Sequence, residues 1–427
     1  MIHSGEHALA GSHARETYVH PSVCLFTDSL EPSGLGEHML TLAVELQASY
    51  DLSFVCPATS HGRPLLDRAA RMGLPTLALA TDGQAGSELG RWLRGRQLQL
   101  FHSHAGIGWE GHGGIYAARE AGVPVVIRTE HLPYLITEPR ERKDHRRLMP
   151  RVDRLICVSK HAHASFVEAG VRPEQLQVVR NGIHPRPARA DREGVRARLG
   201  LSSEARLVLA VGRLTEQKGH RYLVQAAPRV IEQEPRAQLV VVGQGELADD
   251  LRELVRALGL EGRVHFVGQR PDVPELLAAA DLFVLPSLFE GLPLVALEAM
   301  AAGRPVVGTW GCGTAEAVAD GVTGRLVFPR DATALAAAIL EALQQPALAA
   351  RWGMAGRMRL EREFRAERMA RETASVYEEV LVRTHAPAVG ATGRSPVAAH
   401  PAQLDEGRVA GRPYALTWSK SESASDE

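Results

Sequence analysis

Cysteine is scarce in this chain, with four in 427 residues and no CxxC pair among them. Three of the four, Cys24, Cys56 and Cys157, lie in short apolar runs of the kind that form buried strands. We therefore expect buried free thiols in a reducing compartment and no zinc site built from cysteines.

An excess of charge and long apolar runs are also absent. The formal net charge is −1, and 45% hydrophobic with 23% charged residues is ordinary for a soluble globular protein. Without a basic excess, the composition excludes a general nucleic-acid binder. No apolar run reaches the roughly 20 residues of a membrane helix, and residues 1–18 lack the apolar segment of a secretion signal. The sequence therefore predicts a cytoplasmic protein.

Short apolar runs alternate with longer amphipathic segments from about residue 19 onward. Strands that are apolar on both faces and alternate with helices predict parallel sheets covered on both sides, which is an α/β fold. In the first half the runs are 23–26, 52–56, 76–80, 98–104, 123–131, 154–159 and 176–182. In the second half they are 206–214, 237–245, 263–269, 282–287, 304–309 and 324–328.

The two halves are separated by "NGIHPRPARADREG", whose Pro, Arg and Ala content is typical of an interdomain linker. Two doubly wound domains fit the chain length, and ligands bind such sheets outside the carboxyl ends of the strands, so a cleft between the domains is expected. The expected parts are a disordered start (1–17), a first domain (18–188), a second domain (189–363), a strong helix (364–385) and a disordered tail (386–427).

Two stretches of the first half place polar or glycine residues just after predicted strands. "DSLEPSGLGEHMLTLAVEL" opens a helix, and Gly34 and Gly36 would let the backbone approach an anionic ligand at the helix N-terminus. A tight strand-to-helix turn explains the same glycines. "VVIRTEHLPY" ends a strand with Glu130 and His131, and a histidine there is well placed to bond a substrate hydroxyl. The alternative is a structural cap on the sheet.

A third stretch, "LFHSHAGIGWEGHGG", places His102 and His104 at a strand end, with His112 further on. An HxH pair at a strand terminus can hold a metal, as in hydrolases of the barrel class. No Asp or further His at ligand spacing follows in the second half to complete such a site. We therefore favour His104 facing the cleft, on the acceptor side with Glu130, and His102 packed inside.

In the second half, "VGRLTEQKGHRYL" places Arg213 directly after Gly212, at a strand end, and Lys218 at the start of a helix. A fork-shaped guanidinium and a point-charge ammonium at one helix N-terminus suit a diphosphate. The alternative is that both cations are simply solvated.

The most specific stretch is "FEGLPLVALEAM", residues 289–300, which carries Glu290 before a helix start and Glu298 within the helix. The carboxylate of Glu290 can reach into the cleft, and the N–H groups from Gly291 to Leu294, except that of the proline, can meet a phosphate.

Glu298 lies among apolar residues, where a carboxylate without partners is costly. Paired ribose hydroxyls are natural donors to both of its oxygens. A salt bridge to Arg304 or Arg325 is the alternative.

A basic run, "PRERKDHRRLMPR", occupies residues 139–151. Most such runs are solvated faces of a helix. The other interpretations are an acidic acceptor or a peripheral contact with an anionic membrane, on its inner face.

With these motifs the chain resembles the retaining glycosyltransferases of family 4. The similarity runs from about residue 19 to 380 and includes "SGLGEH", "VVIRTEH", "VVRNGIHP", "VGRLTEQKG" and "VHFVGQRPDVPELLAAADLFVLPSLFEGLPLVALEAMAAGRPVV". "EGLPLVALE" looks like the E-x7-E signature of that family. The resemblance implies the GT-B fold, with two Rossmann-like domains facing a central cleft, and the helix at 364–385 crossing back to the first domain.

The resemblance also implies roles for matching residues. Glu298 would bind the ribose, while Glu290 and His131 would contact the donor sugar. Arg213 and Lys218 would stabilise the leaving diphosphate. The implied catalytic residues are His131, Glu290, Arg213 and Lys218. The implied donor-binding residues are Gly34, Gly36, Gly212, Arg213, Lys218, Glu290, Gly291, Leu292, Pro293, Leu294 and Glu298.

The chain departs from the family pattern at two places. Ser33 precedes Gly34 where many relatives have two glycines, and His184 stands in the linker where an Asp is common. Neither departure touches the donor motifs of the second domain.

The implied activity is transfer of a hexosyl-type sugar from a UDP- or GDP-linked donor to a hydroxyl of a carbohydrate, lipid-linked or small-molecule acceptor, with retention at the anomeric carbon. Such an enzyme serves polysaccharide, glycolipid or glycoconjugate biosynthesis. It uses same-face attack without a nucleophilic carboxylate, and we expect no cofactor and no metal. The base, sugar and acceptor are left open by the sequence.

Three other classes compete with this assignment. A sugar phosphorylase or a nucleotide-sugar epimerase would share the fold, but a phosphorylase needs a pyridoxal-bearing lysine, and the chain has only Lys143, Lys160, Lys218 and Lys420. A metal-dependent hydrolase would use His102, His104 and His112. A non-catalytic nucleotide-sugar-binding protein would bind the donor and never turn it over.

Overall fold

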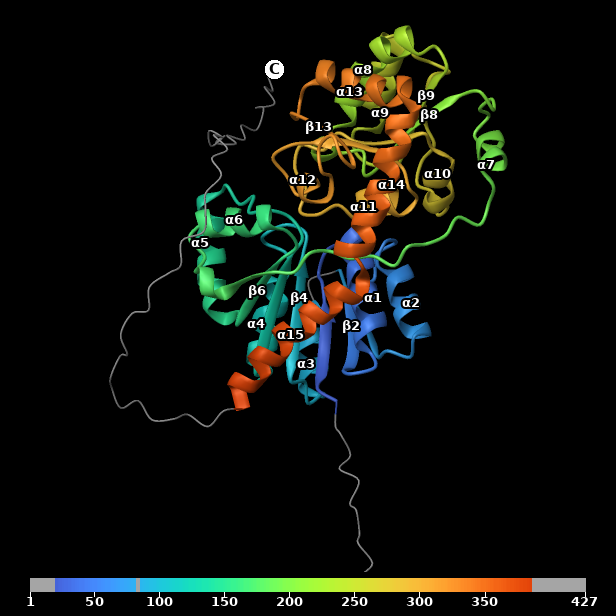
Figure 1. Cartoon of the computed structure of the whole chain (residues 1–427). Coiled ribbons are helices and arrows are strands. Elements are labelled where there is room, and N and C mark those ends of the chain that lie inside the picture. The colour runs from blue at the N-terminus through green and yellow to red at the C-terminus, as the bar shows by residue number, and fades with distance from the viewer. Residues whose placement is uncertain (1–19, 82–84, 386–427) are drawn as a thin grey trace, which may run out of the picture.

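The computed structural model describes residues 20–81 and 85–385, so the predictions for 1–17 and 386–427 lie outside the described residues. The molecule has two α/β domains, each a parallel sheet with helices on both faces (Figure 1). None of the helices in the two described ranges combines the length and apolar composition needed to cross a membrane.

The first domain contains seven strands and six helices of the α type. They are β1 (Ser22–Phe26), α1 (Ser33–Leu46), β2 (Asp51–Pro57), α2 (Arg63–Arg71), β3 (Thr76–Leu79), α3 (Ala85–Arg94), β4 (Leu100–Ala105), α4 (His112–Glu120), β5 (Val125–Glu130), α5 (Pro139–Leu148), β6 (Arg154–Cys157), α6 (Lys160–Glu168) and β7 (Leu176–Val178).

The second domain follows the linker. Its elements are α7 (Arg192–Arg198), β8 (Arg206–Val211), α8 (His220–Gln233), β9 (Ala237–Val242), α9 (Ala248–Ala257), β10 (Val264–Phe266), α10 (Val273–Ala279), β11 (Leu282–Leu285), α11 (Leu294–Ala301), β12 (Val306–Thr309), α12 (Thr314–Ala317), β13 (Gly324–Val327), α13 (Ala332–Gln344) and α14 (Pro346–Glu363). The last helix, α15 (Ala366–His385), returns to the first domain.

Both sheets have the doubly wound strand order. The first runs β3-β2-β1-β4-β5-β6-β7 and the second β10-β9-β8-β11-β12-β13. The order reverses between β1 and β4 in one sheet and between β8 and β11 in the other. Ligands bind in the crevice at such reversal points, so the loops after these four strands are the places to look for a site.

Each apolar run named from the sequence overlaps one strand, and the two-domain α/β fold is confirmed. The reason is visible in β1, where Val23 and Leu25 belong to one hydrophobic core while Cys24 and Phe26 belong to the core on the other face. A strand buried on both faces needs apolar residues at every position. The cysteines are free and buried, as expected.

The helix α15 lies across the first domain and packs against α1 (Figure 1). Between α14 and α15, Arg365 forms a parallel bridge with Ile183 of the linker, whose N–H donates to the Phe364 carbonyl at 2.9 Å. The atypical His184 of the linker follows and lies 3.1 Å from a carboxylate oxygen of Glu45 on α1. The linker and the crossover helix therefore support each other.

Tyr377 of α15 is fully buried and reaches into the sheet of the first domain. Its hydroxyl lies 2.6 Å from Nδ1 of His102, whose Nε2 lies 2.7 Å from the Thr129 hydroxyl. Both ring nitrogens of His102 are thereby satisfied, and the ring ties the crossover helix to β4 and β5.

We predict that Tyr377→Phe lowers the free energy of unfolding by about 1–3 kcal/mol, because it leaves a buried nitrogen of His102 without a partner. The matched control is Tyr50→Phe, since Tyr50 packs edge-on against Tyr377 with ring centroids 5.4 Å apart but makes no side-chain hydrogen bond within the described residues. Urea denaturation of the three proteins measures the difference. Equal losses in both variants would contradict a role for the His102 bond.

Candidate active site

A cavity of about 890 Å³ lies between the two domains, at the carboxyl ends of both sheets. Its walls come from the segments after β1, β4 and β5 of the first domain and after β8 and β11 of the second. These include all four segments at the reversal points of strand order. The domain arrangement therefore brings the two expected ligand crevices face to face.

An ion pair lies in the second-domain wall. Nζ of Lys218 is 2.6 Å from Oε1 of Glu290, and the Ser287 hydroxyl donates to the same oxygen at 2.8 Å. Glu290 is buried, and Lys218 and Glu290 both border the cavity. The structure gives Oε2 of Glu290 no hydrogen bond within the described residues, so this oxygen is free to accept one from a ligand hydroxyl.

Arg213 stands beside this pair and points across the cavity. Its guanidinium lies 3.4 Å from Glu31 of the first domain and 3.3 Å from the amide oxygen of Gln217. These are long contacts on a side chain that is 39% exposed. Gly212, just before it, also borders the cavity, and a Cβ there would lie 3.4 Å from the Lys218 side chain. Arg213 can thus turn toward an anion in the cleft at little cost, whereas Lys218 would have to exchange its bond to Glu290.

The segment from Gly291 to Leu294 lines the cavity up to the first turn of α11, as the sequence predicts. The first turn of a helix leaves its N–H groups without partners inside the helix, which favours an anion there. Gly291 is pressed against the first domain, because a Cβ at this position would collide with the carbonyl oxygen of His131.

Glu298 lies deeper in α11 and does not border the cavity. Its carboxylate has no hydrogen bond or ion pair within the described residues, so the alternative of a salt bridge to Arg304 or Arg325 is wrong. Burial raises the pKa of Glu298 to about 7, with Arg186 opposing the shift. Both oxygens of this unpaired carboxylate can therefore accept hydrogen bonds from a ligand.

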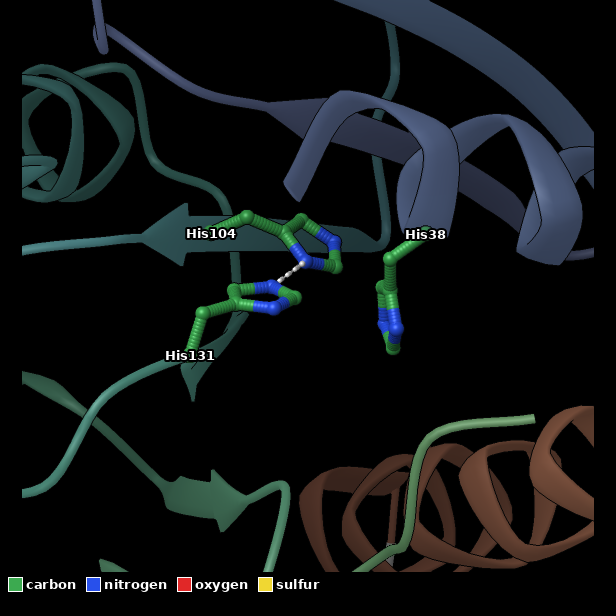
Figure 2. A group of neighbouring side chains, drawn as sticks. All are labelled: His38, His104 and His131. Atoms are coloured by element: carbon green, nitrogen blue, oxygen red, sulfur yellow. Dashed lines mark hydrogen bonds between the residues drawn. The ribbon is translucent and has the colours of Figure 1, made fainter. Parts of the chain in front are cut away.

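His131 borders the cavity from the first domain and is backed by two further histidines, His104 on β4 and His38 on α1 (Figure 2). Nδ1 of His104 lies 3.3 Å from Nε2 of His131, and the rings of His38 and His131 meet edge to face with centroids 4.6 Å apart. Burial lowers the pKa of all three, that of His38 to about 4, so the rings are neutral at pH 7.

The expectation that His104 faces the cleft is wrong, whereas His102 packs inside as expected. Alternate residues of a strand share a face, so both rings lie on the same side of β4, stacked with centroids 4.0 Å apart, and both are fully buried. His104 lies behind His131, one layer below the cavity.

His102, His104 and His112 do not form the metal site considered from the sequence. His112 bonds the carbonyl of Gly108 through Nε2 at 2.8 Å and packs near His145 instead. The second nitrogen of His104 is free, but both nitrogens of His102 are occupied. The three rings therefore lack the common centre that a hydrolytic metal site requires.

Glu130, expected on the acceptor side, is also corrected. It is buried at the end of β5 and pairs with the fully buried Arg128. The guanidinium of Arg128 donates to the carbonyls of Glu110 and, at 2.9 Å, Gly108. The pair thus fixes the loop after β4, and Glu130 supports the cavity wall from behind rather than facing it.

The two glycines of α1 differ in their surroundings. Gly34 borders the cavity, and a Cβ there would have Leu294 of α11 as its nearest neighbour at 4.0 Å. Gly36 does not border the cavity, because it faces α2, where a Cβ would collide with Leu65. Gly36 is a packing glycine, and the expectation that it lets the helix approach a diphosphate is corrected.

The cavity residues that were not singled out from the sequence include Trp109, Leu30 and Asn181. Trp109 is 50% exposed on the loop held by Arg128, and Leu30, which also lines the cavity, is 59% exposed. Asn181 crosses between the domains, because its amide donates to the Leu292 carbonyl at 2.7 Å. The tryptophan stood in the quoted stretch "GIGWEGHGG", where an exposed aromatic beside glycines was an available signal.

The basic run at 139–151 forms α5 and a following turn on the first domain. Its exposed cations are Arg140, Arg142, Lys143, Arg146, Arg147 and Arg151. The membrane contact considered for this helix stays a prediction.

We predict that Gly291→Ala forces the domains apart, because the colliding atom is a backbone oxygen that cannot rotate away. Strain of this kind costs about 1–3 kcal/mol. The expected result is a lower melting temperature and a larger radius of gyration by small-angle X-ray scattering. The control is Gly86→Ala on α3, where a Cβ meets nothing within 4 Å. An unchanged scattering curve and melting temperature for Gly291→Ala would refute the close contact.

Known proteins resemble both halves of the chain. The family described as Glycosyltransferase Family 4 matches residues 32–186, and Glycosyl transferases group 1 matches residues 191–359. The UDP-Gal:alpha-D-GlcNAc-diphosphoundecaprenol alpha-1,3-galactosyltransferase of Escherichia coli is 32% identical over 60% of this chain and 71% of that protein. The alpha-maltose-1-phosphate synthase of Mycolicibacterium smegmatis is 30% identical over 81% of this chain and 95% of that protein.

Among solved structures, HepE from Anabaena in complex with UDP and glucose superposes with a TM-score of 0.75 at 21% identity, covering 84% of this chain and all of that one. This likeness concerns the fold. Together with the sequence matches to both domains, it agrees with the facing sheets and the cleft described above. The chain therefore belongs to the family 4 glycosyltransferases and has their GT-B fold.

Proposed function

We propose that the enzyme transfers a hexosyl sugar from a nucleotide-diphospho-sugar to a hydroxyl acceptor, with retention at the anomeric carbon. The observation that carries this proposal is the grouping of Arg213, Lys218, Glu290 and the first turn of α11 around one cavity, opposite His131. Two cations and free N–H groups suit a diphosphate, and a buried carboxylate beside them suits sugar hydroxyls.

The diphosphate lies, in this proposal, between Arg213, Lys218 and the start of α11. Negative charge grows on the leaving phosphate as the glycosidic bond breaks, and fixed cations stabilise it most strongly at that point. Lys218 would exchange its bond with Glu290 for the phosphate, leaving Glu290 to accept from the sugar. The free Oε2 of Glu290 is available for that bond from the start.

The acceptor side is formed, we propose, by Trp109 and Leu30. A half-exposed tryptophan in the cavity wall offers a flat apolar surface, and the apolar face of a sugar ring stacks on such a surface. The acceptor hydroxyl then meets the anomeric carbon from the same face as the leaving phosphate, whose oxygen takes the proton. No carboxylate acts as nucleophile in this course.

The relatives support a UDP-linked hexose as donor. The Escherichia coli enzyme is named for transfer from UDP-Gal to an undecaprenol-linked sugar, and HepE was solved with UDP and glucose. We therefore propose a UDP-hexose donor and a carbohydrate or lipid-linked acceptor. Incubation with a panel of nucleotide sugars tests the activity, and the anomeric proton coupling in the product tests retention. An inverted product would refute the same-face course.

We predict that UDP stabilises the protein by about 2.7 kcal/mol at 100 times its dissociation constant. Glu298→Gln should weaken UDP binding by about 10- to 100-fold, because the ribose hydroxyls lose a charged acceptor. The control is Glu253→Gln, an exposed residue of α9. Titration calorimetry with UDP, GDP and ADP measures the affinities. Equal UDP affinity in wild type and Glu298→Gln would remove Glu298 from the nucleotide site.

The same residue predicts a pH dependence. The carboxyl of Glu298 has a pKa of about 7 in the free protein, raised by burial, and ribose hydroxyls bind its ionised form. Binding therefore releases a proton below about pH 7, and affinity should rise from about pH 5.5 through about pH 7 and level off near about pH 8, where the free carboxyl is already ionised. The Glu298→Gln variant should show no such rise. A parallel rise in the variant would assign the titration to another group.

We predict that Trp109→Ala raises the KM for the acceptor about tenfold while the affinity for UDP is unchanged, because the variant removes apolar surface from the acceptor wall only. The control is Trp310→Ala, a tryptophan that is 37% exposed but lies outside the cavity wall. Initial rates with the acceptor found in the transfer screen give KM and kcat. A loss confined to UDP binding would move Trp109 to the donor side.

A further inference from the structure

His38 and His104 have no part in the transfer proposed above, yet they converge on His131 at the floor of the cavity (Figure 2). One ring nitrogen from each lies within 4.8 Å of the others. The three come from α1, β4 and the end of β5, so the fold, and not a local sequence motif, brings them together.

The hydrogen bonds of His38 leave one nitrogen available. Nδ1 of His38 lies 3.0 Å from Oδ1 of Asn181, and the amide nitrogen of Asn181 donates to the Leu292 carbonyl. The amide orientation is therefore fixed, and Nδ1 of His38 must carry the proton that it donates. The other nitrogen, Nε2, then carries a lone pair. A metal-binding histidine is oriented in this way, by donating its second N–H to an oxygen.

His104 and His131 already stand at ligand spacing. Zinc takes imidazole nitrogens at about 2.0–2.1 Å in tetrahedral geometry, which places two such nitrogens about 3.3–3.4 Å apart. Nδ1 of His104 and Nε2 of His131 are 3.3 Å apart. His104 is fully buried, and its other nitrogen, Nε2, has no partner. His102 cannot compete for an ion, because both of its nitrogens are bonded.

We propose that His38, His104 and His131 form a binding site for one divalent transition ion of the zinc class, with its fourth position open to the cleft. Three imidazoles suit zinc, cobalt or nickel and not magnesium or calcium, which prefer oxygen ligands. The ion binds Nδ1 of His104 and Nε2 of His131, and these two bonds replace the hydrogen bond between the two rings. The site is inhibitory, because bound metal blocks the sugar-facing wall of the cavity.

The test uses the full chain, freed of metal by a chelator. Zinc titration by calorimetry and the visible absorption of bound Co²⁺, which is intense only in four-coordinate sites, report binding without any measure of transfer. We expect one ion per chain in the wild type. His38→Gln and His104→Gln should each weaken binding by at least about tenfold, since even loss of a supporting hydrogen bond to a ligand costs about 10- to 100-fold.

A second group of possible ligands, Glu45, His184 and Glu367, supplies the matched control. Glu45→Gln removes one of its members and should leave zinc affinity unchanged. Equal affinity in wild type and His38→Gln would overturn the proposal, as would a loss of the ion in Glu45→Gln.

Melting curves without metal show whether each variant folds. If the histidine variants do not fold, X-ray absorption of the zinc-loaded wild type decides, because three imidazoles around the ion support the site and fewer refute it. The inhibitory effect rests on the proposed transfer, but the site does not. UDP titration in the absence of metal distinguishes failure of the zinc site from failure of the proposed transfer function. A protein that binds UDP but not zinc refutes only the zinc site, and a protein that binds zinc but not UDP refutes only the transfer function.

Discussion

The arrangement of the active site depends on the contact between Gly291 and the carbonyl of His131. At this point the backbone of one domain touches the backbone of the other, and no side chain fits between them. Glu290 and the start of α11 are thereby held opposite the cleft histidine, and the amide of Asn181 fixes the same segment through the Leu292 carbonyl. A site formed between two domains needs such a rigid contact, because small changes in the distance between catalytic groups on the two domains lower the rate strongly.

The fold was predictable because its signal is local. A strand buried on both faces is apolar at every position, and β1 divides its residues between two cores for that reason. The second-domain site was predictable for a similar reason. Glu290 and the backbone up to Leu294 are adjacent in sequence and follow β11. Arg213 and Lys218 both follow β8. Because both loops lie at the carboxyl ends of strands in one sheet, identifying the strands was enough to place these groups on one cleft wall. Glu298 remains the exception, since the structure leaves its carboxylate unpaired and away from the cavity.

The first-domain site was less predictable because its members act through distant partners. Glu130 ends the strand that His131 follows. Only the structure shows that Arg128 packs under the loop after β4 and pairs with the buried Glu130 carboxylate. Gly36 lies two residues after the cavity glycine Gly34, yet the neighbouring helix α2 decides its role. The placement of His104 beside His102 was available in principle, because residues two apart on a strand share a face. His38 ends the stretch "SGLGEH", but nothing in that stretch shows that its ring meets the rings of His104 and His131.

The histidines form a graded series from the core to the cleft. His102, tied to α15 by Tyr377, has both nitrogens bonded and serves the structure. His104 stacks on it with one nitrogen bonded and one unpartnered, and His131 borders the cavity. Nδ1 of His104 faces His131, and its buried Nε2 has no partner within the described residues. Buried polar atoms without a partner are uncommon in native proteins. His131 is the ring of this series that borders the cavity, so substrate or a metal ion can be bound there.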